Sequence, residues 1–499
     1  MKRQSGVLMH VSSLPSKYGI GSFGTEAYKF IDYLVESKQK LWEVLPLNQT
    51  GFGDSPYSSC CSYSFNPYFI SLEALVGQGL LKKSELIGQE GETPYVDYGK
   101  LYNTRYALLK KAFTRFDKEN EDFKAFVKKG KYKDYALYMT LKSALNNKAF
   151  YDWPEEFKFR DQNALNIFAK EHENEMLYWQ FIQYEAGLEW DMLKGYANAN
   201  GIAIIGDMPL YVAYDSVDVW ANPKIFKLDE NLTPKKVAGV PPDYFSATGQ
   251  LWGNPVYDYE VLEKDGFKWW VDRFVNTLKM FDYIRIDHFR GFDRYYEIDY
   301  GRDSALIGEW VKVPSERLFE RIHAKISKNK VIAEDLGIID DGVRELLKSV
   351  GYPGMRILSF AFDGQDNNLY LPENIEENSI CFTGTHDNDT LIGLLDHASE
   401  WDYGNIAIGV RKSLKKLAIK KPVGNKKQIA RAIIELGFAC KANTFIIPMQ
   451  DVLLLNGDYR MNTPGREIAN WTMKLKSSAF TKTSAEYLAK LTEKYNRFN

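Results

Sequence analysis

The sequence predicts an α/β protein built on a closed (β/α)8 barrel. Three observations support this prediction: eight short β-rich segments recur along the 499 residues, most of them follow an amphipathic helix, and several end in acidic side chains. Apolar strands that alternate with helices are typical of a parallel sheet covered by helices. Eight such units favour a (β/α)8 barrel, whose working residues lie just beyond the C-terminal ends of the strands.

The eight expected strands are rich in Val, Ile, Leu and aromatic residues, which favour extended backbone. The first four are GVLMH from Gly6, LWEVLP from Leu41, IAIIG from Ile202 and YIRI from Tyr283. The last four are VIA from Val331, MRILSF from Met355, ICFTG from Ile380 and TFIIP from Thr444.

The helices between the strands are marked by apolar stripes and by start and stop signals. Apolar residues recur at helical spacing between Asp265 and Phe281, which indicates a helix with one buried face. Asp340 is placed to cap a further helix, and Gly351 follows as its C-terminal stop. An aromatic helix from about Met176 to Ala199 ends just before the third strand.

Two long insertions, after strands two and three, interrupt an otherwise single catalytic domain that spans residues 1–499. Residues 72–170 are Lys/Glu-rich, with Leu, Tyr and Phe at helical intervals, and predict a mostly helical inserted subdomain. Residues 209–259 are rich in Gly, Pro, Asn and Asp and predict an inserted loop region over the active-site cleft. The chain after Pro448 is short and helical near Ser484 to Tyr495, so we expect no C-terminal β-sandwich domain.

Composition argues against several classes of partner. The 64 basic and 66 acidic residues give a net charge of −2, which leaves no basic field for nucleic acid or for a membrane surface. No apolar run approaches the ~20 residues of a membrane span, and the N-terminal sequence lacks a signal-peptide cleavage site. The four cysteines form no CxxC pair and predict a reduced, cytoplasmic location.

Polar residues gather at four expected strand ends. Asp207 lies at the tip of the third strand, Arg285, Asp287 and His288 follow the fourth, Glu334 follows the fifth, and His386 and Asp387 follow the seventh. Arg285 and Asp287 are two residues apart and therefore face the same side of a strand, where the guanidinium lowers the pKa of the carboxyl group. One such pair is as compatible with a structural ion pair as with a nucleophile, but four acidic ends at one mouth are hard to explain as caps.

Two chemistries fit several carboxylates at one barrel mouth. One is glycosyl transfer by a nucleophile and an acid/base that flank the scissile bond. The other is a hard-metal or zinc hydrolase, which would gain from a His-x-His pair on the first strand, where His10 stands alone. The 32 Tyr and 11 Trp residues offer stacking faces that suit a sugar better than a metal. We therefore expect no metal and no cofactor.

Motifs along nearly the whole chain resemble those of the amylomaltases, the bacterial 4-α-glucanotransferases or disproportionating enzymes (glycoside hydrolase family 77) of the α-amylase clan. The motifs are SSLPSKYGIGSFG from Ser12, GDSPYSS from Gly53, GDMPLYVAYDSVDVW from Gly206, VPPDYFSATGQLWGNP from Val240, RIDHFRG from Arg285, AEDLG from Ala333, GTHDNDT from Gly384 and RMNTPG from Arg460. A minor departure is Glu43 in WEVLPL, where the family pattern implies Gln.

The resemblance implies a role for each matched residue. Asp287 corresponds to the nucleophile, Glu334 to the acid/base and Asp387 to the carboxylate that stabilises the transition state. The implied substrate-binding residues are Tyr57, Asp207, Trp252, Arg285 and His386. We also expect Asp54, His288, Tyr244 and Phe245 to bind substrate, since the His288 ring is able to bond sugar hydroxyls and the two aromatic rings offer stacking faces. The implied donors are maltooligosaccharides and longer α-1,4-glucans, with glucose as an acceptor. A plain α-glucan hydrolase, a metal-dependent barrel hydrolase and a non-catalytic glucan-binding protein remain as alternatives.

Three structural expectations follow. The carboxyl oxygens of Asp287 and Glu334 should lie about 5–5.5 Å apart, the separation for a retaining mechanism. Glu334 should have a raised pKa and Asp287 a low one, because one must hold a proton while the other stays ionised. Val240 to Asp258 should fold over the cleft as a partly mobile, non-regular loop that excludes water.

Overall fold

The computed structural model describes residues 2–51, 53–91, 93–242, 247–466 and 469–498. Its central element is a sheet of eight parallel strands in the order β10–β11–β12–β1–β2–β3–β6–β9. The bounds are β1 Gln4–Leu8, β2 Leu41–Glu43, β3 Ala203–Met208, β6 Tyr283–Ile286, β9 Val331–Ala333, β10 Gly354–Ile357, β11 Ser379–Phe382 and β12 Thr444–Pro448. All eight expected strands are confirmed.

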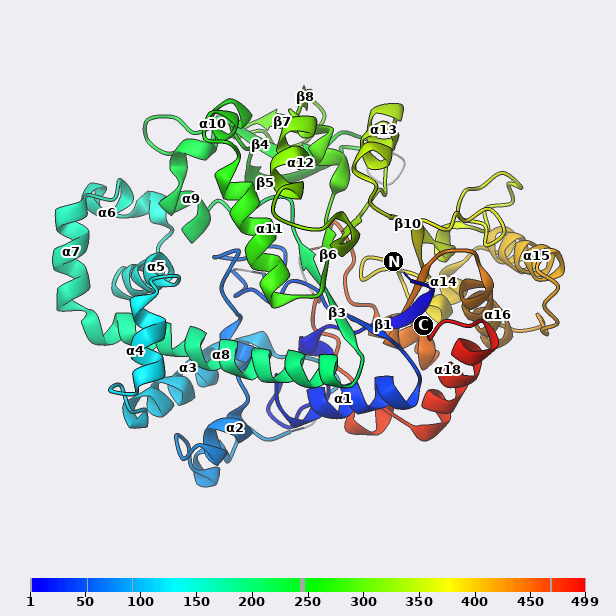
Figure 1. Cartoon of the computed structure of the whole chain (residues 1–499), viewed down its shortest axis with the longest axis horizontal. Helices are drawn as coiled ribbons and strands as arrows, with labels where there is room; N and C mark the ends of the chain where they lie inside the picture. Colours follow the sequence, from blue (N-terminus) through cyan, green and yellow to red (C-terminus); the bar gives the residue numbers. More distant parts are fainter. Residues whose placement is uncertain (1, 52, 92, 243–246, 467–468, 499) are drawn as a thin grey trace.

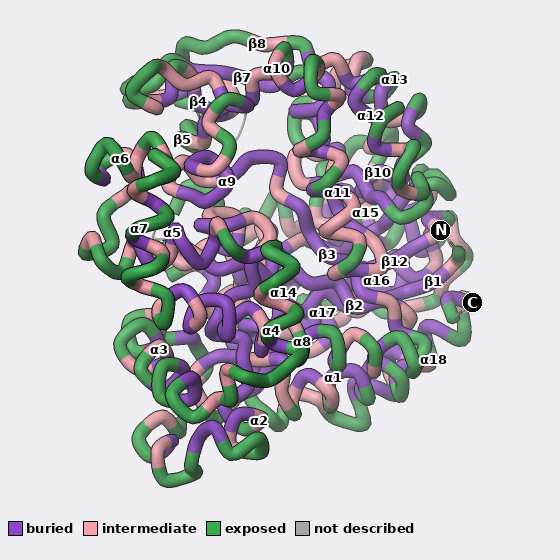
Figure 2. The backbone as a smooth tube through the Cα atoms, turned by 60° about the vertical axis from the view of Figure 1, so that its left-hand side comes forward, coloured by how far each residue is buried: buried purple, intermediate pink, exposed green. Residues whose placement is uncertain are grey.

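The sheet closes on itself between β9 and β10. The Ala333 N–H donates to the Pro353 carbonyl at 3.0 Å. The Asp335 carboxylate, just past β9, accepts from the Met355 N–H of β10 at 2.6 Å and from the Arg356 guanidinium at 2.9 Å. Asp335 therefore joins two neighbouring strands of the barrel. Figure 2 shows the barrel strands β1, β2, β3 and β12 as buried, with exposed chain concentrated in the peripheral helices and loops.

The helix that follows Asp340 begins and ends where its local signals predict. The Asp340 side chain accepts from the Val343 N–H at 3.1 Å, and Gly351 ends that helix with a φ of 76°, a left-handed conformation that favours glycine. The helices that accompany the strands are α1 Thr25–Glu36, α8 Glu173–Ala199, α11 Lys268–Met280, α12 Ser315–His323, α13 Asp341–Val350, α14 Leu391–His397, α15 Glu400–Lys416, α16 Lys426–Ala439, α17 Met449–Val452 and α18 Lys482–Lys494.

The chain between β2 and β3 is helical. It contains α2 Leu72–Gly77, α3 Tyr98–Arg115, α4 Glu121–Lys128, α5 Lys133–Ala144, α6 Glu155–Lys158 and α7 Gln162–Glu171. In Figure 1 these helices form a lobe at one side of the barrel, and α3, α4 and α5 pack on the long helix α8. Aromatic pairs such as Phe113 with Phe181, at 5.4 Å between ring centroids, fill the interface between α3 and α8.

A second, antiparallel sheet was not expected from the sequence. Its strands are β5 Gln250–Pro255, β4 Lys236–Val240, β7 Arg294–Asp299 and β8 Glu309–Lys312, in that order. The expectation of a non-regular backbone from Val240 to Asp258 is therefore wrong for Gln250–Pro255. Gly and Pro in this hairpin weaken its strand signal, and β4 pairs with β7 across a long stretch of chain, which local sequence does not reveal.

Two shorter helices, α9 Val217–Ala221 and α10 Tyr259–Lys264, flank the β4–β5 hairpin in the sequence. In Figure 1 the antiparallel sheet lies on the same side of the molecule as α10 and α12. Within the described part of the chain, no helix is both long enough and apolar enough to cross a membrane.

Candidate active site

Arg285 is the centre of a buried ionic cluster. In the parallel register of β3 and β6, Asp207 and Arg285 lie directly opposite each other. The Arg285 guanidinium holds both Asp207 oxygens, through Nε at 3.0 Å and Nη2 at 2.9 Å, and both side chains are only 2% exposed. Nη2 also donates to Asp287 Oδ1 at 3.0 Å and to the Tyr57 hydroxyl at 3.2 Å. Charge-assisted bonds of this kind fix orientation as well as charge, so Arg285 sets the position of Asp287.

The carboxyl groups of Asp287 and Glu334 lie side by side at the ends of the paired strands β6 and β9. Each carboxyl group shifts the pKa of the other. No distance between their oxygens is fixed here, so our expectation of about 5–5.5 Å stays a prediction. Two partly buried carboxylates that face each other repel, which favours a proton on one of them.

The directions of the two pKa shifts are the reverse of our expectation. Burial and the neighbouring Glu334 charge raise the pKa of Asp287 well above its usual range, although Arg285 opposes them. Burial works in the same direction on Glu334, but Arg285 and the hydrogen bonds from Asp287 and from the His288 N–H hold the pKa of Glu334 below its ordinary value. The two directions favour protonation of Asp287 over protonation of Glu334.

His288 contributes its backbone to this arrangement. Its φ of 50° lies in the left-handed region, where residues other than glycine are uncommon. In this conformation its N–H donates to Glu334 Oε2 at 2.7 Å. Burial lowers the pKa of the His288 ring to about 4, despite the nearby Glu334 charge. The ring is therefore neutral at physiological pH and able both to donate and to accept.

Asp387 is held by a segment to which sequence reasoning gave no role. The Asn462 side-chain amide donates to Asp387 Oδ1 at 2.6 Å, and the Arg460 guanidinium donates to the Asp387 backbone carbonyl. The Asn462 N–H in turn donates to the His386 carbonyl at 3.1 Å. Arg460 and Asn462 belong to the RMNTPG motif, which the sequence showed. Their contact with Asp387, after β11, could not be read from the sequence. The Asp387 side chain stays 40% exposed and therefore accessible from solvent.

Aromatic rings border the carboxylates. The Tyr57 and His386 rings stack at 5.1 Å with an interplanar angle of 18°. Trp471 lies 5.6 Å from Tyr57 and 5.7 Å from His386, between ring centroids. Nothing in the local sequence pointed to Trp471, because it lies far along the chain from Tyr57 and His386, the two rings that it contacts. The Tyr57 hydroxyl donates to Asp207, which ties this aromatic group to the ionic cluster.

The other expected substrate-binding residues do not all lie close to the carboxylates. Trp252, on β5, is 37% exposed, and its ring meets the edge of His288 at 4.9 Å. Tyr244 and Phe245 lie outside the described residues. The Asp54 N–H donates to Gly51, and burial raises the pKa of its carboxyl group to about 6. Among the described residues, Asp54 forms no hydrogen bond or ion pair with Asp287, Glu334 or Asp387.

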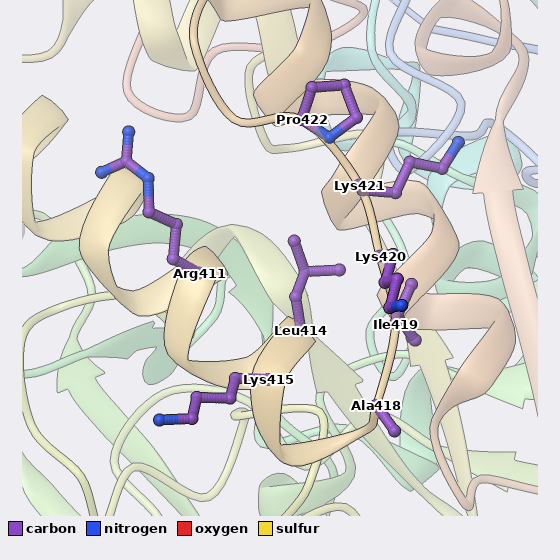
Figure 3. Close-up of a pocket in the computed structure, with 8 residues that line it drawn as sticks. All are labelled: Arg411, Leu414, Lys415, Ala418, Ile419, Lys420, Lys421 and Pro422. Atoms are coloured by element: carbon purple, nitrogen blue, oxygen red, sulfur yellow. The ribbon is translucent and has the colours of Figure 1, made fainter.

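Two further features of the molecule lie outside this cluster of carboxyl groups. Among the described residues, no group of three or more His, Cys, Asp or Glu side chains is arranged to hold a metal ion. A surface hollow of about 780 Å³ lies between α15 and the segment from Ala418 to Pro422. Figure 3 shows Leu414 of α15 between the two segments, with lysines around the rim. None of the residues discussed above lines this hollow, so it is separate from the candidate site.

The fold and the carboxyl groups at the barrel mouth are typical of one class of protein, the (β/α)8 enzymes that act on glycosidic bonds. The family model described as 4-alpha-glucanotransferase matches residues 9–480. The chain therefore belongs to the 4-α-glucanotransferase family, as its motifs implied.

Relatives and solved structures agree with this assignment. The chain is 42% identical to the 4-alpha-glucanotransferase of Clostridium butyricum, over 98% of this chain and 100% of the relative. It is 41% identical to the enzyme of Thermus thermophilus, over 95% of each. The fold is similar to that of the amylomaltase from Streptococcus agalactiae in complex with acarbose. This match covers 100% of each chain, with a TM-score of 0.94 and 38% identity. Transferase activity is thus confirmed over the hydrolase, metal-dependent and non-catalytic alternatives.

Proposed function

We propose that this chain moves segments of maltooligosaccharides and longer α-1,4-glucans to the 4-hydroxyl of an acceptor glucose or glucan, by double displacement at the anomeric carbon. Asp287 acts as nucleophile, Glu334 as general acid and base, and Asp387 as the carboxylate that stabilises the transition state. The observation that carries the proposal is the placement of Asp287 and Glu334 at the ends of the adjacent strands β6 and β9, where each shifts the pKa of the other. A retaining pair has its carboxyl groups about 5–5.5 Å apart and an inverting pair about 6.5–9.5 Å, so close placement of the two groups favours retention.

In the first step, the proton of the pair crosses from Asp287 to Glu334 as the donor glucan takes its place. Glu334 then protonates the 4-oxygen of the leaving glucan while a carboxylate oxygen of Asp287 bonds to the anomeric carbon. The glycosidic bond breaks and the leaving segment departs with a 4-hydroxyl. Because the two groups share one proton, the apparent pKa values of the reaction belong to the pair.

In the second step, ionised Glu334 takes the proton of the acceptor 4-hydroxyl, whose oxygen attacks the anomeric carbon and displaces Asp287. Two inversions give net retention, and the proton is again on the pair. Arg285 supports both steps because its charge favours ionised Asp287. Asp387, fixed by Asn462, is placed to offset the positive charge that develops on the sugar ring.

The inserted segments 72–170 and 209–259 supply the surroundings of the cleft in this proposal. Trp252 sits on the 209–259 segment with its ring against His288, and offers a partly exposed stacking face beside the carboxylates. Tyr244 and Phe245, on the same segment, would help to exclude water until a sugar acceptor arrives. A cytoplasmic location goes with this proposal, since the four cysteines are unpaired thiols.

Trapping of the covalent intermediate tests the mechanism. The Glu334→Gln variant is incubated with α-maltosyl fluoride, whose fluoride leaves without help from an acid. A maltosyl adduct on the peptide that contains Asp287 is expected, because attack by Asp287 survives while removal of the sugar is slow. Asp287→Asn is the matched control and should give no adduct. An adduct on another residue, or none in either variant, would overturn the role of Asp287.

Chain-length analysis of the products from maltotriose tests the transfer. Longer oligomers together with glucose are expected, because a donor segment is joined to an acceptor sugar. Glucose and maltose alone would mean that water is the acceptor and that the proposed acceptor site does not operate.

A further inference from the structure

Arg290 is a buried arginine close to the candidate site. It belongs to the RIDHFRG motif, three residues after Asp287, and lies on the short helix Phe289–Phe292 that follows β6. Its side chain is only 7% exposed. A guanidinium keeps its charge when it is buried, and a buried charge is costly unless it is paired and hydrogen-bonded. The partners of Arg290 therefore indicate what its charge does in the folded protein.

Both terminal nitrogens of Arg290 donate to the segment that follows Glu334. Nη1 donates to the Ile338 carbonyl, and Nη2 donates to Asp340 Oδ2 at 3.2 Å. Asp340 in turn caps α13 by accepting from the Val343 N–H at 3.1 Å. The rigid fork of a guanidinium is able to hold two acceptors at once. Arg290 thus holds this segment both in its middle and at its junction with α13.

Residues 336–339 have few other attachments. They belong to no helix or strand. Among the described residues, the bond from Arg290 to Ile338 is the only hydrogen bond that reaches the backbone of residues 336–339. The side chains of Leu336 and Ile339 pack against the core, but apolar contacts are not directional. The orientation of this backbone therefore depends on Arg290.

Arg290 is itself held on the other side. Its carbonyl accepts from the Asp293 N–H at 2.9 Å. Its guanidinium lies over the ring of Trp310, 3.9 Å from the centroid, which is a cation–π contact. Trp310 is on β8, and its ring meets that of Tyr296 on β7 at 5.2 Å between centroids. Arg290 is thus fixed between the turn after β6 and the antiparallel sheet.

The two segments that Arg290 joins also meet at Glu334. The Phe289 N–H donates to the Glu334 carbonyl at 3.1 Å, and the His288 N–H donates to Glu334 Oε2 at 2.7 Å. These two bonds attach the start of the segment from Glu334 to Asp340, and the fork of Arg290 attaches its end. The whole segment is therefore held against the turn after β6 at both of its ends.

We propose that Arg290 is a positioning residue for Glu334, which it aims at the leaving oxygen by fixing the segment that follows Glu334. The inference rests on the proposed function, in which Glu334 is the general acid and base. Proton transfer requires the acid to lie within hydrogen-bond reach of the oxygen, and a misplacement of about 1 Å costs about 10²-fold in rate. Loss of Arg290 should slow the steps that need Glu334. The attack by Asp287 should be spared, because Arg285 sets the position of Asp287.

A competing explanation is that Arg290 only packs on Trp310 and stabilises the fold. The Nε atom of Arg290 is buried and has no hydrogen-bond partner among the described residues. An unpaired buried donor is destabilising. The guanidinium is therefore turned toward Ile338 and Asp340 at a cost in stability, which favours the positioning role.

Two donors that differ in their need for an acid separate these explanations. Maltotriose is cleaved only when Glu334 protonates the leaving sugar, whereas the fluoride of α-maltosyl fluoride leaves without an acid. Arg290→Met keeps an apolar stem over Trp310, and its kcat with maltotriose should fall about 10- to 100-fold. Its first release of fluoride, measured before the steady state, should stay within about twofold of the wild-type rate. Arg290→Lys should show a smaller loss of the same kind, because an ammonium group does not hold both acceptors in the geometry of a guanidinium.

Three reference variants complete the experiment. Glu334→Gln should show the same selective loss with maltotriose as Arg290→Met. Trp310→Leu removes the ring and keeps both hydrogen bonds of Arg290, so it measures packing alone. Arg302→Met removes an exposed arginine that pairs with Asp299 at 3.5 Å, and it should stay within about twofold of the wild type with both donors. The Tm of each variant reports its stability.

The inference is overturned if Arg290→Met retains wild-type activity or slows both donors equally, or if Trp310→Leu shows the same selective loss. Where Arg290→Met does not fold, Arg290→Lys decides, and a wild-type ratio between the two donors would overturn the positioning role. Equal losses with both donors in Glu334→Gln would instead contradict the proposed function, and the role of Arg290 would fall with it.

Discussion

The contact between Asn462 and Asp387 gives a prediction whose size follows from the structure. In the Asn462→Ala variant, Asp387 loses the amide that donates to Oδ1 at 2.6 Å. The backbone contact from Arg460 remains, so the segment stays attached while the carboxylate is freed to rotate. We therefore expect reduced transition-state stabilisation with little change in the fold.

The magnitude depends on how much water replaces the lost donor. A hydrogen bond to a charged group contributes about 1.5–3 kcal/mol. Since the Asp387 side chain is 40% exposed, water recovers part of this energy, and a net loss of about 1–2 kcal/mol is reasonable. Each 1.4 kcal/mol corresponds to about tenfold in rate, so kcat/KM should fall about 5- to 30-fold.

The assay is disproportionation of maltotriose, followed as kcat/KM for the release of glucose. Asn456→Ala is a matched control, because the Asn456 amide bonds only the exposed Asp458 carboxylate among the described contacts, and it should stay within twofold of the wild type. An Asn462→Ala enzyme with wild-type kcat/KM would refute the positioning role. A fall in Tm together with activity would assign the loss to the fold instead.

Three further changes have expected outcomes. Burial raises the pKa of Glu43 from about 4.5 to about 8, so the folded protein binds this proton more tightly than the unfolded chain and loses stability as pH rises through this window. Urea unfolding should show that the free energy of unfolding of Glu43→Gln, relative to that of the wild type, is about 1–3 kcal/mol higher at pH 7.5 than at pH 5.5. The same difference at both pH values would contradict this prediction. Glu334→Gln should lower turnover by about 10²–10⁴-fold and remove the alkaline limb of the pH–rate profile, and an unchanged bell-shaped profile would remove Glu334 from this role. Truncation of Tyr244 and Phe245 to Ala should raise the ratio of hydrolysis to transfer, measured as reducing ends released per oligomer extended. A flat ratio in a still active variant would assign water exclusion to another part of the chain.

Much of the fold could be predicted from local sequence signals. The strands from Gly6 to Thr444 were recognisable because buried parallel strands are continuous apolar runs, and the helix from Asp340 to Gly351 because caps act within one turn. The β4–β5 hairpin was missed, since its glycines and proline weaken the strand signal and its partner β7 is distant in the sequence. Pairing between strands that are far apart in the sequence leaves no pattern in the local sequence.

The sequence by itself placed the candidate residues at one end of the barrel, because parallel strands all deliver their C-terminal ends to one mouth. Asp207, Arg285 and Asp287 were placed by that rule alone. Only the tertiary structure decided the directions of the Asp287 and Glu334 pKa shifts and the segment that orients Asp387. Proton occupancy depends on burial and on charges a few ångströms away. The Asn462 contact depends on the path of the chain after β12. Both are set by distances in space, which the order of residues along a chain does not contain.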